Sequence, residues 1–178
     1  IKEAVFWLLD FAGYRRYPNQ NKVEVGVKKN LHHMTSNTVE EKKEFVLPIP
    51  SGTNSFLYAY LMEDRCIDKR VIDFFVENNL TYEARGYHNI VFRGNDKNGV
   101  TRFASQRGVF DRNGRAFKCD VEGNDKNFGF NVVCEDSHEL YVFEAAIDLM
   151  SYMDLYDDFE TNKLALGMVH DAPVVTFL

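Results

Sequence analysis

The chain has 178 residues, of which 45% are hydrophobic and 14% aromatic, a composition that supports a folded core and excludes a wholly disordered protein. No apolar run approaches the roughly 18 residues that a membrane span requires, so we expect no membrane partner. The three cysteines are widely spaced and form no CxxC pair, which supports neither a zinc knuckle nor a disulfide framework and predicts a cytoplasmic protein with reduced thiols.

The first segment, residues 1–44, is predicted to be a helix followed by a polar linker. Apolar residues recur at helical spacing over Ile1–Ala12, and Gly13 ends that pattern. The stretch from Tyr14 to Glu44 shows no sustained period. It contains His32-His33, but neighbouring residues of a strand face opposite ways and no third ligand is spaced nearby, so surface histidines are favoured over a metal site. Because the chain opens inside a helix, we expect it to be a fragment of a longer protein.

Two short helices are predicted next. Asn54–Arg65 carries Phe56, Leu57, Tyr60 and Leu61 at helical spacing. A second helix, Lys69–Asn78, follows Asp68, whose short carboxylate suits an N-cap. Together they predict a helical hairpin.

From Leu80 the hydrophobic period changes to two, which predicts an antiparallel β region. Asn98-Gly99 is a strong signal for a hairpin turn within it. The expected strands are Leu80–Tyr82, His88–Phe92, Thr101–Gln106, Ala116–Val121 and Phe128–Val133.

This β region is basic within an acidic chain. Residues 85–126 hold nine Lys/Arg against five acids, a charge of +4, whereas the rest of the chain carries −10. A basic stretch of this kind can hold the phosphate backbone of single-stranded DNA or RNA, although a solvated hairpin rich in turns gives the same count. Arg107-Gly108 in particular sets a guanidinium beside a flexible backbone. The candidate nucleic-acid-binding residues are Arg85, Arg93, Arg102, Arg107 and Lys118.

A pair of carboxylates marks the last segment. The apolar run Leu140–Phe143 predicts a strand, and Glu144 stands at its carboxyl end, where open α/β sheets place their ligands. Asp148 comes one helical turn later, near the same face. Two carboxylates at a strand end suit Mg²⁺, and acids stabilised by a helix dipole are the alternative explanation. An apolar run at Leu164–Met168 and a helix beginning near Pro173 would complete a parallel strand–helix–strand unit.

Several of these segments resemble a known family. LYVFEAAIDLMSY, from Leu140, resembles the first motif of the Toprim domain, the metal-dependent module of bacterial primases, topoisomerases and some nucleases. Ala59–Ile67 is similar to the YL..RGI helix of the bacterial primase core. NDKNGVTRFASQRG resembles the glycine-rich hairpin of that core, and Phe117–Phe130 occupies the place of its KY.N segment. The best resemblance is to primase-like proteins of plasmids and conjugative elements, in which an uncharacterised domain precedes a Toprim-like domain.

The resemblance implies an architecture and a role. Residues 1–44 would be the tail of a zinc-finger domain plus a linker, 45–137 a primase-core-like α+β domain, and 138–178 the first part of a Toprim-like parallel sheet. The fold class expected is therefore an α+β part with a helical hairpin and antiparallel strands, followed by the start of an α/β sheet. Glu144 and Asp148 would be catalytic residues and metal ligands in the full-length protein. The family's second motif, Asp-x-Asp, does not follow Asp148, so Mg²⁺ is expected to bind this chain weakly or not at all.

The function implied is nucleic-acid processing. The full-length parent would be a primase-like nucleotidyltransferase that uses nucleotides and carries out metal-dependent phosphoryl transfer, and this fragment alone would be inactive. Two alternatives stay open from the sequence: a non-catalytic module that binds single-stranded nucleic acid, and a Toprim nuclease.

Overall fold

The computed structural model describes residues 43–112, 115–168 and 170–178. The helix predicted over Ile1–Ala12, the linker after it and the His32-His33 pair lie outside these residues. Within them the elements run α2 (Ser55–Ala59), η1 (Tyr60–Asp64), α3 (Lys69–Glu77), β1 (Thr81–Glu83), β2 (Ile90–Asn95), β3 (Thr101–Arg112), β4 (Arg115–Asp120), β5 (Phe130–Val132), β6 (Leu140–Phe143), α4 (Ala146–Tyr156), β7 (Asn162–Ala165) and α5 (Ala172–Phe177).

The predicted helical hairpin is confirmed, with one local difference. The first helix starts as the α-helix α2 and widens into the π-helix η1 over Tyr60–Asp64. The predicted cap of α3 is present, because the Asp68 carboxylate accepts a hydrogen bond of 2.7 Å from the N–H of Arg70. The widened turn matters for the site, because π-helical turns change which side chains share a face and are frequent at functional positions.

Four strands form an antiparallel sheet in the order β1-β2-β3-β4. The hairpin predicted at Asn98-Gly99 joins β2 to β3, and Gly99 has the positive φ of +76° that such a turn requires. The side chain of Asp96 fixes this turn by accepting hydrogen bonds from the N–H groups of Asn98 and Val100, at 2.9 and 3.0 Å.

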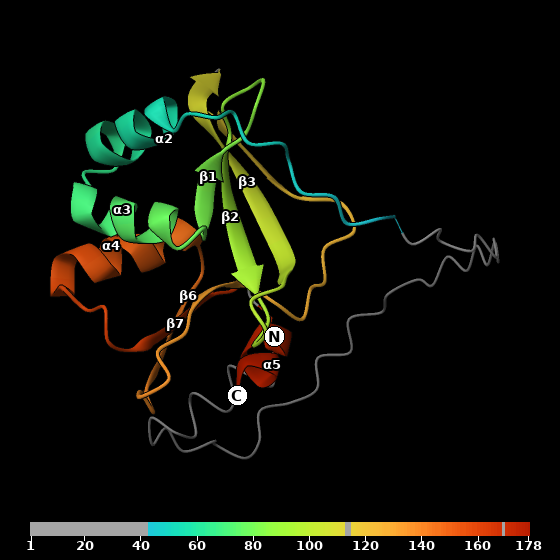
Figure 1. Ribbon diagram of the computed structural model, residues 1–178, viewed down its shortest axis with the longest axis vertical. Helices are drawn as coiled ribbons and strands as arrows, with labels where there is room; N and C mark the ends of the chain where they lie inside the picture. Colours follow the sequence, from blue (N-terminus) through green and yellow to red (C-terminus); the bar gives the residue numbers. More distant parts are fainter. Residues whose placement is uncertain (1–42, 113–114, 169) are drawn as a thin grey trace, which may run out of the picture. The chain divides into compact units, whose positions relative to one another are not determined.

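The two faces of this sheet pack differently. Ile90 and Phe92 of β2 face the main core beneath the helices, whereas Val91 and Ala104 face a smaller cluster closed by Phe45 and Leu47. In Figure 1, α2 and α3 lie along one face of the sheet, and α4 lies next to α3. The helices contact β1, so the parts of β3 and β4 on this face are free to line a pocket.

A second sheet has the order β5-β7-β6. β6 and β7 are parallel, as predicted, and α4 connects them. The strand predicted at Phe128–Val133 was assigned to the antiparallel region, and that assignment is wrong: β5 pairs antiparallel with β7, with Phe130 opposite Ala165. The protein is therefore α+β, with one antiparallel and one mixed sheet, because β5 joins the parallel pair from the opposite direction.

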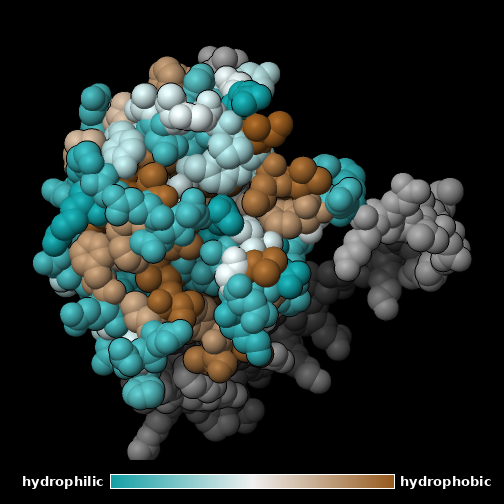
Figure 2. All heavy atoms as spheres, in the orientation of Figure 1, coloured by the Kyte–Doolittle hydropathy of each residue, from teal (hydrophilic) through white to brown (hydrophobic). Residues whose placement is uncertain are grey.

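One core unites the helices and both sheets. It contains Leu57, Ile72 and Phe75 from the helices, Phe130 from β5 and Met150 from α4, all buried. Residues 42–178 accordingly form one compact unit, although the sequence suggested a division between 137 and 138. No helix among the described residues is long and apolar enough to cross a membrane. On the face seen in Figure 2, hydrophobic residues form small separate groups among hydrophilic ones.

Candidate functional site

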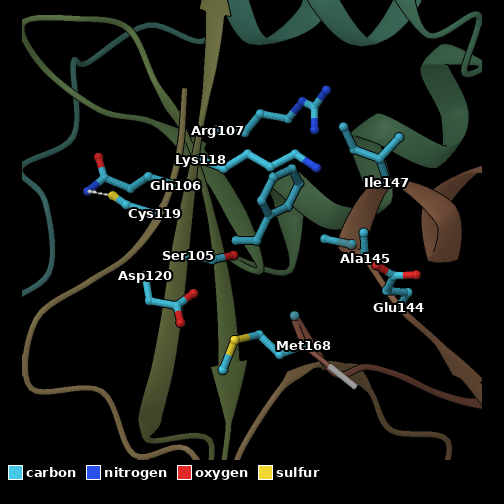
Figure 3. Close-up of a pocket in the computed structure, with 13 residues that line it drawn as sticks. Ser105, Gln106, Arg107, Lys118, Cys119, Asp120, Glu144, Ala145, Ile147 and Met168 are labelled. Carbon is cyan, nitrogen blue, oxygen red and sulfur yellow. Dashed lines mark hydrogen bonds between the residues drawn. The ribbon is translucent and has the colours of Figure 1, made fainter. Parts of the chain in front are cut away.

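A pocket of about 350 Å³ lies at the carboxyl ends of the two parallel strands. One wall is the sheet, from which Ser105, Arg107, Lys118 and Asp120 line the space. The opposite wall is the loop from Glu144 to Ile147, and Gly167-Met168 closes one side. Figure 3 shows Arg107 and Lys118 extending from the strands toward the side of the pocket that carries Ile147. This is the position at which sheets with parallel strands bind ligands.

The loop wall is held by backbone hydrogen bonds. β6 ends at Phe143 and β7 at Ala165, and the two connections then run side by side. Leu166 N–H donates to the carbonyl of Phe143 at 3.0 Å, and Gly167 N–H donates to the carbonyl of Glu144 at 2.9 Å. These two bonds join the connections that follow β6 and β7, and so hold Glu144 and Gly167 together at the edge of the pocket.

Arg107 in the sheet wall and Arg65, which lies outside the pocket lining, are held by one tyrosine; with Lys118 they are called the cationic wall. The hydroxyl of Tyr60 accepts a hydrogen bond of 2.6 Å from Nε of Arg107. It also accepts from Nε and Nη2 of Arg65, at 2.8 and 2.6 Å. Both guanidinium groups lie over the Tyr60 ring, 5.2 Å and 5.8 Å from its centroid. Tyr60 is itself buried, so two positive charges are held together on a fixed support.

These charges have no carboxylate partner among the described residues. The ion pairs of that part of the chain involve other cations, such as Arg70 with Asp157 and Arg102 with Asp96. Lys118 stands directly across from Arg107 in the β3–β4 register and is likewise unpaired within the described residues. Adjacent like charges repel, and an anion that bridges them would remove this cost.

The five predicted cations do not form one surface. Arg107 and Lys118 meet at the pocket, whereas Arg93 sits opposite Ala104 and faces the smaller cluster. The guanidinium of Arg93 donates to the hydroxyl of Thr101 at 2.9 and 2.6 Å. Arg102 is tied to Asp96 in the β2–β3 turn, at 2.8 Å. Arg85 is exposed in the turn after β1. Successive side chains of a strand point to opposite faces of the sheet, so counting basic residues along the sequence does not show which of them share a surface.

The two predicted carboxylates are placed unequally. Glu144 follows β6 directly and lines the pocket, opposite the cations. Asp148 is exposed in the first turn of α4 and is not among the lining residues. No group of three or more His, Cys, Asp or Glu side chains within the described residues could hold a metal ion. Mg²⁺ needs six oxygen ligands and takes part of them from protein and substrate, so Glu144 and Asp148 alone make an incomplete donor set.

Tyr60 and Arg65 hold Arg107 from outside the pocket lining and were not predicted as functional residues. The sequence placed them in the first helix, outside the basic stretch of residues 85–126. Their spacing of five residues fits no ordinary helical face, and it brings them together because η1 is a π-helix. The hydrogen bond to Arg107 spans 47 positions of the chain, so no local signal could have indicated it.

A second polar arrangement was also missed. The carboxylate of Glu83 in β1 is fully buried, and its Oε1 lies 2.6 Å from Nδ1 of His88. Its Oε2 accepts hydrogen bonds from the N–H groups of Phe56 and Leu57, at 2.9 and 3.2 Å. With both oxygens acting as acceptors, Nδ1 is the donor, and Nε2 lies on the side of the ring away from Glu83.

Comparisons with known proteins add a partial match. Residues 59–136 match the family model described as "Protein of unknown function (DUF3991)", a range that includes Tyr60, Arg65, Arg107 and Lys118 and ends before Glu144. The chain is 34% identical over 122 residues to an uncharacterized protein of Bacillus anthracis, pXO2-78. That alignment covers 66% of this chain and 35% of the relative, so the chain spans about a third of the relative's length. No solved structure matches the chain.

Proposed function

We propose that this chain binds the phosphate groups of a nucleic-acid strand, DNA or RNA, at the pocket bounded by Arg107 and Lys118. The observation that carries the proposal is the pair of guanidinium groups fixed on the Tyr60 hydroxyl with no carboxylate partner among the described residues. Guanidinium groups are weakly hydrated and offer forked donors, which match phosphate oxygens. A phosphate group on Arg65 and Arg107 would replace repulsion with two charge-assisted contacts.

The size and position of the pocket favour single strands. A volume of about 350 Å³ is at the lower end of the range for small ligands and would admit one nucleotide rather than a duplex. Lys118 on β4 would contact the next phosphate, because it is the cross-strand neighbour of Arg107. Binding of this kind is tolerant of sequence and weakens as salt rises.

Metal-dependent phosphoryl transfer by the longer protein is a second candidate function. The placement of Glu144 favours it, since this residue follows a parallel strand and lines the same pocket as Arg107 and Lys118. In a primase-like or nuclease parent, Glu144 and Asp148 would be two of the Mg²⁺ ligands, and the metal would stabilise charge on the reacting phosphate. The remaining ligands would have to come from outside this pair. If the longer protein is not catalytic, the same surface would serve only to bind single-stranded nucleic acid.

The test is binding of a labelled single-stranded oligonucleotide at 50 and 200 mM salt, with and without Mg²⁺. We expect affinity to fall as salt rises, and Arg107→Ala to lower the slope of log affinity against log salt by about 0.7, the loss of one phosphate contact. Arg70→Ala is the matched control, because Arg70 is paired with Asp157 on another element. Unchanged affinity of Arg107→Ala at low salt would refute the assignment.

Glu144→Gln separates the catalytic and binding alternatives in the same assay. If Glu144 helps to hold a metal near the phosphate, Mg²⁺ will tighten binding by the unmodified chain and will have a smaller effect on the variant. Equal responses of both proteins to Mg²⁺ would favour the binding module.

A further inference from the structure

An exposed aromatic cluster lies next to the cationic wall. The ring of Phe56 is 4.4 Å from that of His88 and 5.5 Å from that of Phe110, measured between centroids. Phe56 is 40% exposed and Phe110 53% exposed, so these rings meet at the surface rather than in the core. Exposed rings in mutual contact on a polar surface commonly mark a binding face.

The aromatic cluster joins the same helix and strand that bring Tyr60 and Arg107 together. Phe56 precedes Tyr60 by four residues, one helical turn or about 6 Å. Phe110 follows Arg107 by three residues on β3. Both contacts join the first helix, α2 continued by η1, to β3, where a register irregularity between Arg107 and Asp111 interrupts strict alternation of the side chains. Phe56 and Phe110 are therefore carried by the same helix and the same strand as the arginines.

His88 is held as part of this surface. Its backbone lies in the left-handed region, with φ of +56°, which non-glycine residues rarely adopt. The buried carboxylate of Glu83 holds the ring at Nδ1 and also anchors the N–H of Phe56, so one side chain positions two members of the cluster. Such pre-organisation lowers the entropy lost when a ligand binds.

We propose that the cluster of Phe56, His88 and Phe110 stacks unpaired bases of a single strand whose phosphates lie on Arg65 and Arg107. The proposal rests on the proposed function and names the part of the ligand that the cations do not contact. Stacking on aromatic rings is how proteins hold single strands without reading their sequence. Paired bases in a duplex have no free face to offer, so the cluster would also select single strands.

A second group of aromatic rings shows why the cations matter. Tyr141, Tyr152 and Tyr156 also stack, and Tyr156 is 69% exposed. This group is accompanied by acids: the Tyr141 hydroxyl bonds to Glu139, and the charge of Asp158 helps to raise the pKa of Tyr152, after burial and the hydrogen bond with Tyr141. A phosphate backbone would be repelled there. The tyrosine group is therefore the matched control.

The test compares a labelled oligothymidylate with an abasic oligonucleotide of the same length, which has the same phosphates and no bases. We expect the unmodified chain to bind the oligothymidylate about tenfold more tightly, the contribution of one stacked base. Phe110→Leu should remove this preference while leaving affinity for the abasic strand and its salt dependence unchanged. Phe110→Tyr, which keeps the ring, and Tyr156→Leu should both retain the preference.

The outcomes separate the two proposals. Equal, salt-sensitive binding of both oligonucleotides by the unmodified chain would overturn base stacking and leave phosphate binding in place. Loss of the preference in Tyr156→Leu to the same extent as in Phe110→Leu would also overturn it. Failure of both oligonucleotides to bind at low salt would overturn the proposed function together with this inference.

Discussion

The ammonium group of Lys163 is fully buried in β7 and lies 3.2 Å from Oδ1 of Asp158. It also donates to the carbonyl and the hydroxyl of Thr161, each at 2.9 Å. β7 is the central strand of the mixed sheet, so this charge sits where the strand pairs on both sides. A buried charge is tolerated only with its partners, which makes the loop from Asp158 to Thr161 part of the support of the sheet.

We expect Asp158→Asn to lower the free energy of unfolding by about 3 kcal/mol at pH 7, because Lys163 would lose its counter-ion. The effect should depend on pH. Burial alone would raise the pKa of Asp158, but hydrogen bonds from the Thr161 hydroxyl, the Glu160 N–H and Lys163 hold it below its usual value. A carboxyl group whose pKa is lower in the folded than in the unfolded protein stabilises the fold fully at pH values above the unfolded pKa of about 4. This stabilisation is lost as pH falls through the lower pKa of the folded protein.

Urea unfolding of both proteins at pH 7, 4.5 and 3 checks this. The difference in unfolding free energy should be largest at pH 7 and shrink at pH 3. Asp136→Asn, at an exposed position, is the control. A difference that stays constant across these pH values would contradict the assigned role of the carboxylate.

Glu83→Gln should lower the free energy of unfolding by about 2 kcal/mol, because hydrogen bonds to a charged group typically contribute 1.5–3 kcal/mol. A glutamine has one acceptor oxygen and cannot serve both His88 and the N–H groups of Phe56 and Leu57. Glu77→Gln, on the exposed end of α3, should change it by less than about 0.5 kcal/mol. Equal stability of the two variants in urea unfolding would argue against this role of Glu83.

Gly94→Ala should be among the more damaging substitutions in the sheet. A Cβ at Gly94 would stand 2.1 Å from the carbonyl oxygen of Gly129, where β2 passes the chain leading into β5. Separating these backbones would cost about 3 kcal/mol. Gly86→Ala is the matched control, since its Cβ meets nothing within 4 Å and only its φ of +95° opposes the change, at about 1 kcal/mol. Thermal unfolding by circular dichroism should rank them in that order; the reverse order would count against a close approach of β2 and Gly129.

Tyr60→Phe tests how the cations are held. It keeps every positive charge and the ring but removes the oxygen that accepts from Arg65 and Arg107. We expect oligonucleotide affinity to fall about two- to tenfold, because the arginines lose the acceptor that positions them, with an unchanged salt slope because no charge is lost. Tyr58→Phe, which loses a hydroxyl bonded to Asp73 instead, should bind normally. A changed salt slope in Tyr60→Phe would mean that the hydroxyl does more than position the arginines.

Features that depend on a few neighbouring residues could be predicted from the sequence. Asp68 caps α3, Asn98-Gly99 turns β2 into β3, and Glu144 separates β6 from α4 as expected. Each depends on contacts within about four residues, so the same chemistry operates in almost any tertiary context. The local order of strand, Glu144 and helix also predicted a pocket at the carboxyl end of β6, where the structure has one.

The tertiary structure alone decided which strand β5 joins, which cations share a face and what holds them. A strand of three residues such as Phe130–Val132 carries no information about its partner. It pairs with β7 in the second sheet, while Phe130 packs in the shared core against Phe75 and Phe92. Likewise, Arg107 meets Tyr60 and Arg65 only when the first helix packs against the antiparallel sheet. Hydrophobic burial is not directional, so the sequence determined the elements and their polarity, while packing of the whole core selected their neighbours.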